Sequence, residues 1–158
     1  MKRPLYDAAD GVTARHLPDQ AFPFLSLAER DRLLAYGREQ RFEQGEAIVR
    51  EGHYCRAIYV LITGRVAVEK ERLGEGVVVD ELRPGAVFGE ISFLDGSQAS
   101  ASVVAREPAA VFILDELDLL LASDPSLATG FYRSLASLLA RRLRFATEEG
   151  VRGLIASV

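Results

Sequence analysis

The pattern that most restricts the fold is a series of short β-rich segments, each followed by a glycine-containing turn. The segments are Arg41–Glu43, Ala47–Arg50, Ala57–Ile62, Arg65–Glu69 and Val77–Leu82. The turns contain Gly45, Gly52, Gly64 and Gly85, with Gly74 and Gly76 in a further loop. Short strands separated by turns at this interval are typical of a compact antiparallel roll or barrel.

Helices are expected on both sides of the strands. Ser26 and Glu29 form a capping box, in which the serine oxygen accepts a first-turn N–H and the glutamate reaches back. This helix is expected to end at Gly37, and its apolar face would contain Leu27, Leu33, Leu34 and Tyr36. After a closing strand over Ala109–Leu114, Asp115 is expected to cap a short helix over Glu116–Leu121.

A long helix is predicted after Asp124 and Pro125, with the aspartate as cap and the proline at the first helical position. It should run to about Thr147 or beyond. Its wide apolar stripe can cover the roll along one edge, and the other edge forms a near-heptad seam of Tyr132, Leu135, Leu139, Leu143 and Ala146. The seam favours a homodimer; the alternative is a helix that only folds back on the roll. The cluster of Arg141, Arg142 and Arg144 is predicted to be a solvated helix face.

The fold class expected is therefore α+β, mainly β: an antiparallel β-roll or jelly-roll with flanking N-terminal helices and a long C-terminal helix. Three parts are predicted. Residues 1–25 form an N-terminal extension, loose or docked late, residues 26–147 form the domain with its last helix, and residues 148–158 form a C-terminal tail.

The stretch from Pro84 to Ala105 carries the candidate site. A Pro-Gly turn and a short strand lead to Gly89, where the missing Cβ lets a ligand approach the backbone. A short helix beginning just after Gly89 would direct its N–H groups and dipole at the same place, which suits an anion. Glu90, next to that point, could accept hydrogen bonds from a sugar hydroxyl. The alternative is that Glu90 accepts N–H groups of the turn and supports the loop.

The sequences Phe88-Gly89-Glu90-Ile91-Ser92 and Ala101-Ser102-Val103 resemble the phosphate-binding cassette of the cyclic-nucleotide-binding domain family. Catabolite activator proteins and regulatory subunits of cyclic-AMP-dependent kinase belong to this family. The resemblance covers roughly residues 26–143 and implies a small antiparallel β-roll flanked by helices. It also implies that Glu90 holds a ribose 2′-hydroxyl and that an arginine nine or ten residues later pairs with the cyclic phosphate. Ala99 and Ser100 occupy those two positions.

The resemblance implies a cassette that lacks its phosphate arginine, so the binding of cyclic AMP or cyclic GMP, the cofactors it implies, is expected to be weakened or lost. The candidate ligand-binding residues are Phe88, Gly89, Glu90, Ile91, Ser92, Gln98, Ala99, Ser100 and Ser102. An arginine from elsewhere could compensate, and the candidates are Arg56, Arg65, Arg83 and Arg106. Two alternatives remain: a ligand-independent dimeric interaction module, or a pocket for a different small ligand.

Other functional classes are disfavoured by the rest of the sequence. The net charge of −4 argues against broad nucleic-acid binding, and after Thr147 there is no room for the helix-turn-helix module that follows this helix in catabolite activators. Cys55 is the one cysteine and is expected to be a structural thiol; with His16 and His53 apart, no metal site is predicted. No catalytic motif is present, so we expect a stand-alone regulatory domain that is not an enzyme. Without a membrane-spanning run or a signal peptide, we expect the cytoplasm.

Overall fold

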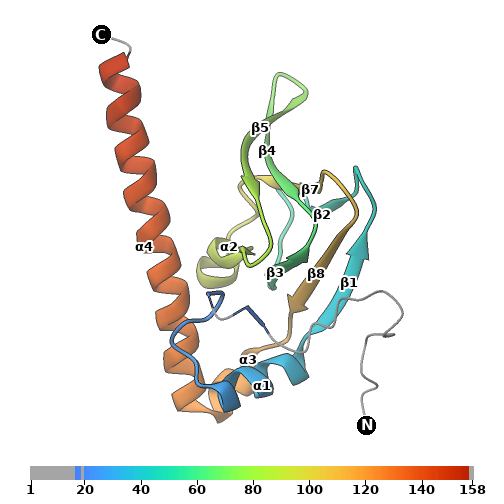
Figure 1. The fold of residues 1–158 in the computed structure, drawn as a ribbon, viewed down its shortest axis with the longest axis vertical. Helices are drawn as coiled ribbons and strands as arrows, with labels where there is room; N and C mark the ends of the chain where they lie inside the picture. The colour runs from blue at the N-terminus through green and yellow to red at the C-terminus, as the bar shows by residue number, and fades with distance from the viewer. Residues whose placement is uncertain (1–16, 19, 157–158) are drawn as a thin grey trace.

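The computed structural model describes residues 17–18 and 20–156, with side chains as far as residue 150. Two four-stranded antiparallel sheets form a roll; helices lie at one end, and a long helix runs along one side and beyond it (Figure 1). The fold class predicted from the sequence is confirmed. No helix in the described part of the chain is both long enough and apolar enough to cross a membrane.

The bounds of the eight strands and four helices in the described part of the chain are as follows, with the strands in the order in which they lie in each sheet. The first sheet, ordered β1-β8-β3-β6, consists of Arg38–Phe42, Ala109–Leu114, Ile58–Thr63 and Val87–Phe88. The second sheet, ordered β2-β7-β4-β5, consists of Ala47–Val49, Ser102–Ala105, Val66–Arg72 and Glu75–Leu82. The helices are α1 (Leu27–Tyr36), α2 (Glu90–Asp95), α3 (Asp118–Ser123) and α4 (Pro125–Ala156).

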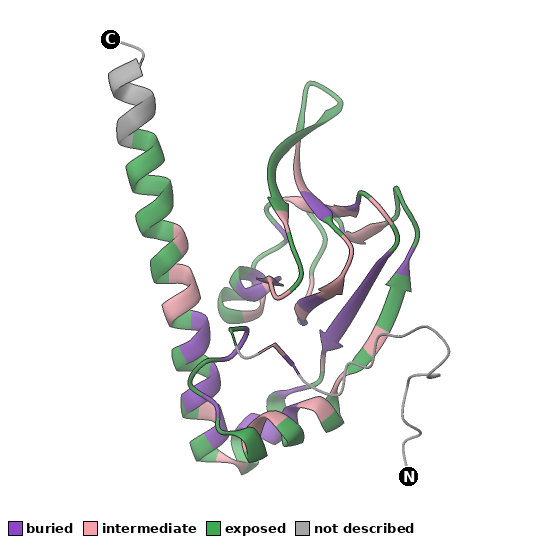
Figure 2. Ribbon diagram, in the orientation of Figure 1, coloured by how far each residue is buried: buried purple, intermediate pink, exposed green. Residues whose placement is uncertain are grey.

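Strand β8 is buried on both faces and separates two hydrophobic clusters (Figure 2). Phe112 and Leu114 face the helices, whereas Val111 and Ile113 face the second sheet. Side chains alternate across a strand, so a strand covered on both faces must be apolar at every position. This is why residues 109–114 form an uninterrupted apolar run.

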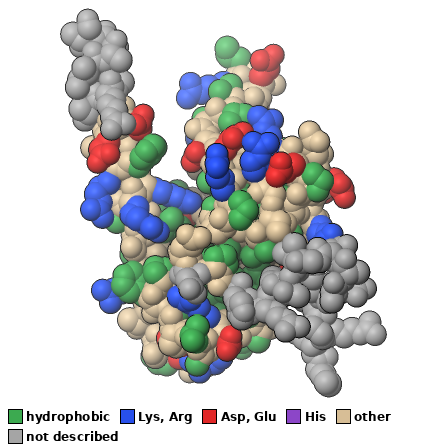
Figure 3. Space-filling model, viewed as in Figure 1, with side chains coloured by type: hydrophobic (Ala, Val, Ile, Leu, Met, Phe, Trp, Pro, Cys, Tyr) green, Lys and Arg blue, Asp and Glu red, His purple; other side chains and the backbone are tan. Residues whose placement is uncertain are grey.

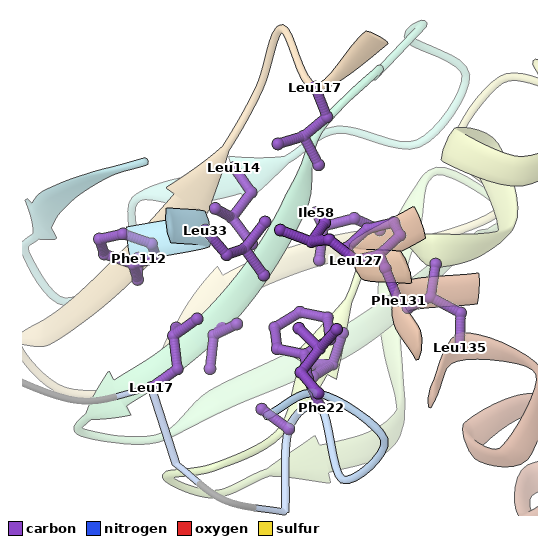
Figure 4. Packing of buried hydrophobic residues seen from close by; sticks show 14 of the residues in the cluster. Leu17, Phe22, Leu33, Ile58, Phe112, Leu114, Leu117, Leu127, Phe131 and Leu135 are labelled. Atoms are coloured by element: carbon purple, nitrogen blue, oxygen red, sulfur yellow. The ribbon is translucent and has the colours of Figure 1, made fainter. Parts of the chain in front are cut away.

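The cluster on the helical side includes residues that precede α1 (Figure 4). Leu17 is 2% exposed, and the Phe22 ring stacks on Phe131 of α4 with a centroid distance of 5.5 Å. Ala21 and Leu25 are also buried. The described part of the expected extension is therefore docked on the domain, one of the two alternatives predicted for it. Residues 1–16 and 19 lie outside the described part of the chain.

The predicted capping box of α1 is confirmed. The Glu29 N–H donates to Ser26 Oγ, and the Ser26 N–H donates to the Glu29 carboxylate. The hydrogen bond from the Ser26 backbone N–H is the largest cause that lowers the pKa of the Glu29 carboxyl, and the hydroxyls of Ser26 and Ser126 lower it further. Gly37 ends the helix as predicted. Leu27 is 77% exposed, so its assignment to the apolar face was wrong.

The predicted N-terminal cap was wrong for α3 and correct for α4. Asp115 does not cap α3: Leu117 occupies the cap position and makes no side-chain hydrogen bond there. Glu116 has a φ of 53°, so the chain turns in the left-handed region before the helix begins. Asp124 does cap α4, because its carboxylate accepts the Leu127 N–H at 3.1 Å.

Helix α4 continues to Ala156, so the expected tail from residue 148 is helical as far as residue 156. Its first half packs on the roll and its described second half is exposed (Figure 2). Leu135 is 1% exposed and lies in the helical-side core. The prediction that Leu135 forms part of a seam with another molecule was therefore wrong. Tyr132 and Leu143 of the predicted seam are exposed.

We predict that Leu17→Ala lowers the free energy of unfolding by about 2–5 kcal/mol, because it leaves a cavity in the core. The matched control is Leu27→Ala, which removes the same atoms from an exposed site and should change stability by less than about 0.5 kcal/mol. Urea denaturation followed by circular dichroism measures both. Equal, small effects would mean that the segment before α1 contributes nothing to the core.

Candidate functional site

A cavity of about 200 Å³ lies between the roll, α2 and α4. Its walls come from four parts of the chain: the loop before β3, the second sheet, the β6–α2 turn with the loop that follows α2, and α4. The lining residues are Val49, Cys55, Val68, Asp80, Leu82, Phe88, Gly89, Glu90, Ile91, Ser92, Ala99, Ser100, Ala101, Val103 and Arg142. The stretch singled out in the sequence thus forms much of the wall of one cavity.

Most of the candidate ligand-binding residues line this cavity, and two do not. Those in the lining are Phe88, Gly89, Glu90, Ile91, Ser92, Ala99 and Ser100. Gln98 is exposed and pairs through its backbone with Tyr54. Ser102 Oγ accepts the Glu51 N–H at 2.9 Å, on the side of β7 away from the cavity. The residues that sequence analysis missed include Asp80 and Arg142.

The turn between β6 and α2 requires glycine at position 89. Gly89 has a φ of 84°, and a Cβ there would lie 2.8 Å from the Ala57 carbonyl oxygen. Beside it, the Tyr59 ring stacks on Phe88 at 5.1 Å, and the Tyr59 hydroxyl lies 2.9 Å from Cys55 Sγ. Burial and the Cys55 contact raise the pKa of Tyr59, so its phenol stays protonated. These contacts fix where Glu90 begins the next helix.

Glu90 is held by a cation from α4. Its side chain is buried, with the residue 2% exposed, and its Oε1 accepts a hydrogen bond from Arg142 Nη1. The other terminal nitrogen of Arg142 donates to the carbonyl oxygen of Val87 in β6. A buried carboxylate needs such compensation, since an unpaired charge away from water is costly. The pair therefore joins α4 to both sides of the β6–α2 turn.

The expectation that Arg142 belongs to a solvated face was wrong, although Arg141 and Arg144 are exposed. The four arginines proposed to compensate for the phosphate arginine do not line the cavity either. Arg56, Arg65 and Arg106 pair with Asp118, Glu107 and Glu69, respectively. Arg83 lies outside the cavity lining.

Helical spacing could have identified Arg142. It lies seven residues after Leu135, and positions seven apart share a face of an α-helix. Leu135 and Leu138 both pack on the roll, so the same face continues to position 142. An arginine on that face, near the end of the packed region, indicates a buried acidic partner.

At the other end of the cavity, Ala99 is buried and bonded through its backbone. Its N–H donates to the His53 carbonyl, and its carbonyl accepts the Gly52 N–H. The loop before it is shaped by Asp95, whose carboxylate accepts the hydroxyl and the N–H of Ser97; these bonds lower the pKa of Asp95. The described lining holds two carboxylates, Asp80 and Glu90, against the one guanidinium of Arg142.

The two-sheet roll encloses a cavity bounded by a strand, a glycine turn, a short helix and one residue of the long helix that follows. This arrangement defines a β-roll domain with an internal cavity. Residues 39–122 match the family model described as the cyclic nucleotide-binding domain. The chain belongs to this family, as the resemblance of its cassette indicated.

Three comparisons support the assignment. The cyclic AMP receptor protein of Thermus thermophilus is 36% identical over 131 residues, which cover 81% of this chain and 59% of that protein. A cyclic nucleotide-binding domain from Methylobacillus flagellatus superposes with a TM-score of 0.75 at 26% identity, covering 83% of this chain and 80% of that one. The structure of the catabolite activator protein from T. thermophilus superposes with a TM-score of 0.69 at 35% identity, covering 82% of this chain and 61% of that one. The chain thus spans less than two thirds of the full-length T. thermophilus relative.

We predict that Glu90 and Arg142 are energetically coupled. Arg142→Gln should cost about 1–3 kcal/mol of unfolding free energy, because it leaves the Glu90 carboxylate buried without its cation. In a double-mutant cycle with Glu90→Gln, the coupling energy should be about 0.5–3 kcal/mol. Arg144→Gln, at an exposed position of α4, is the control. Additive effects of the two single substitutions would rule out the pair as a stabilising contact.

Proposed function

We propose that this chain is a regulatory, non-catalytic domain whose cavity binds cyclic nucleotides weakly or not at all. The observation that carries the proposal is the charge of the described cavity lining, whose one guanidinium, that of Arg142, is bound to Glu90. Ala99 and Ser100 occupy the two positions at which the family resemblance implies a phosphate arginine. Loss of one charge-assisted pair to the phosphate would cost about 2–4 kcal/mol of binding free energy.

The same contacts suggest how a ligand would act on the rest of the molecule. A ligand hydroxyl that reached the Glu90 carboxylate would compete with Arg142 for it. Binding would then favour conformations in which Arg142 has left Glu90 and α4 is free to shift. A ligand without a phosphate does not need an arginine at position 99 and loses no binding free energy from its absence. A different small molecule in the same cavity is therefore consistent with this scheme.

We predict that Ala99→Arg gains cyclic AMP or cyclic GMP binding relative to the unmodified protein. The new guanidinium would pair with the cyclic phosphate. Thermal shift and titration calorimetry test this, because a ligand at 100 times its dissociation constant adds about 2.7 kcal/mol of stability. The matched control is Gln98→Arg, which adds the same charge at the neighbouring, exposed position outside the lining.

Tight, stoichiometric binding of cyclic AMP by the unmodified protein would contradict the proposal. A gain of equal size in Ala99→Arg and Gln98→Arg would show only that added positive charge attracts the nucleotide. If neither variant gains binding, the cavity is closed to nucleotides for a reason other than the missing arginine.

A second candidate function is a dimeric interaction module, which the exposed surface of α4 favours. Tyr132, Ala136, Leu139 and Leu143 recur at intervals of three and four residues, so they share one face. Tyr132 and Leu143 are well exposed. We propose that a second copy of the chain packs on this face.

We predict that Leu143→Glu converts a dimer to a monomer, because it places a charge in an apolar contact. Leu143 is 69% exposed, so the substitution should leave the fold of the single chain intact. Multi-angle light scattering measures the mass. Arg141→Glu is the control, since residues two apart point to nearly opposite sides of a helix. An unchanged mass for Leu143→Glu would refute this dimer surface.

A further inference from the structure

A second cavity, of about 390 Å³, lies on the other side of Arg142. It is bounded by α4, by the turn between β5 and β6, and by the segment before α1. Three arginines line it: Arg83 from the turn, and Arg141 and Arg142 from α4. One carboxylate, that of Glu81, is in the same lining, and Gln20 adds an amide. The described part of the wall therefore carries an excess of positive charge in a chain whose net charge is −4.

Two of these arginines lack the acidic partners that many other arginines of the chain have. Ion pairs hold Arg32, Arg38, Arg56, Arg65, Arg106 and Arg142. Within residues 17–18 and 20–150, no acidic side chain pairs with Arg83 or Arg141. The two residues come from segments 58 residues apart in sequence and line one cavity. Figure 3 shows basic side chains gathered along α4 and on the facing part of the roll.

We propose that this second cavity is a binding site for a small, freely diffusing phosphate compound, held by Arg83 and Arg141. A guanidinium presents its N–H groups as a planar fork that fits two oxygens of one phosphate. Two such forks suit a ligand with several oxygens and more than one negative charge. A single carboxylate would satisfy one fork only, so phosphate and its condensed forms are the better match.

The two cavities share Arg142, which is in the lining of both. An anion in the second cavity attracts the guanidinium that holds Glu90. Binding of the anion and pairing with Glu90 therefore compete for one cation, and the competition is reciprocal. This coupling is a property of the chain's own side chains and does not require that a nucleotide bind in the first cavity.

Inorganic pyrophosphate is the probe, titrated by calorimetry into the full chain at a constant ionic strength of about 0.15 M. We expect saturable binding of one pyrophosphate per chain. Arg83→Gln and Arg141→Gln should each weaken it about tenfold or more, the range expected for a hydrogen bond to a charged group. Arg144→Gln, which removes the same charge from an exposed position outside the lining, should change it less than about twofold.

Glu90→Gln provides a test of the shared arginine. It frees Arg142 from its carboxylate, so we expect pyrophosphate to bind several times more tightly than to the unmodified protein. Absence of saturable binding would overturn the proposal, and so would equal losses in all three arginine variants, which would indicate attraction by charge alone. Arg83 and Arg141 are exposed, so unfolding midpoints without pyrophosphate should be unchanged and confirm that the variants fold.

Discussion

The arrangement of the roll and its last helix depends on one buried carboxylate. Glu90 sits at the first residue of α2 and is removed from water, where a carboxylate without a counter-charge would be strongly destabilised. Arg142 supplies that charge from a segment 52 residues further along the chain, and it also satisfies the carbonyl of Val87. One side chain thus links α4 to both β6 and α2, in addition to the core contacts of Leu127, Phe131 and Leu135.

Most of the fold could be predicted from the sequence because the patterns that specify its strands, turns and helix starts are local. Glycine turns, the capping box at Ser26 and the apolar run of β8 each depend on neighbouring residues, and each predicted its element. The errors concern contacts between distant segments. Leu17 was assigned to an extension and Leu135 to an intermolecular seam, yet both are buried in the same core. Nothing in their immediate sequence distinguishes packing against the chain itself from packing against a partner.

The candidate site shows the same division between local and distant information. The turn at Gly89 and the loop at Ala99 could be located from their motif, and both line the cavity. The charge balance of the cavity could be predicted only in part, because Asp80 and Arg142 reach it from β5 and α4. Helical spacing places Arg142 on the packed face of α4, but no local pattern brings Asp80 to the same cavity. Arg142 also forms the boundary with the second cavity, so the electrostatic states of the two spaces are linked by one guanidinium. A family cassette can therefore be recognised by its sequence, while the charges that face it come from distant segments of the chain.

The length of α4 beyond Arg142 has a mechanical consequence. Fourteen residues separate Arg142 from Ala156, which is about 21 Å of helix. If the ion pair were the pivot, a helix of this length would act as a lever. A tilt of about 10° at the pivot would move the far end by about 4 Å, on the basis of that helix length. Sub-ångström adjustments inside a small cavity would thereby become displacements large enough to alter contacts at a distant surface.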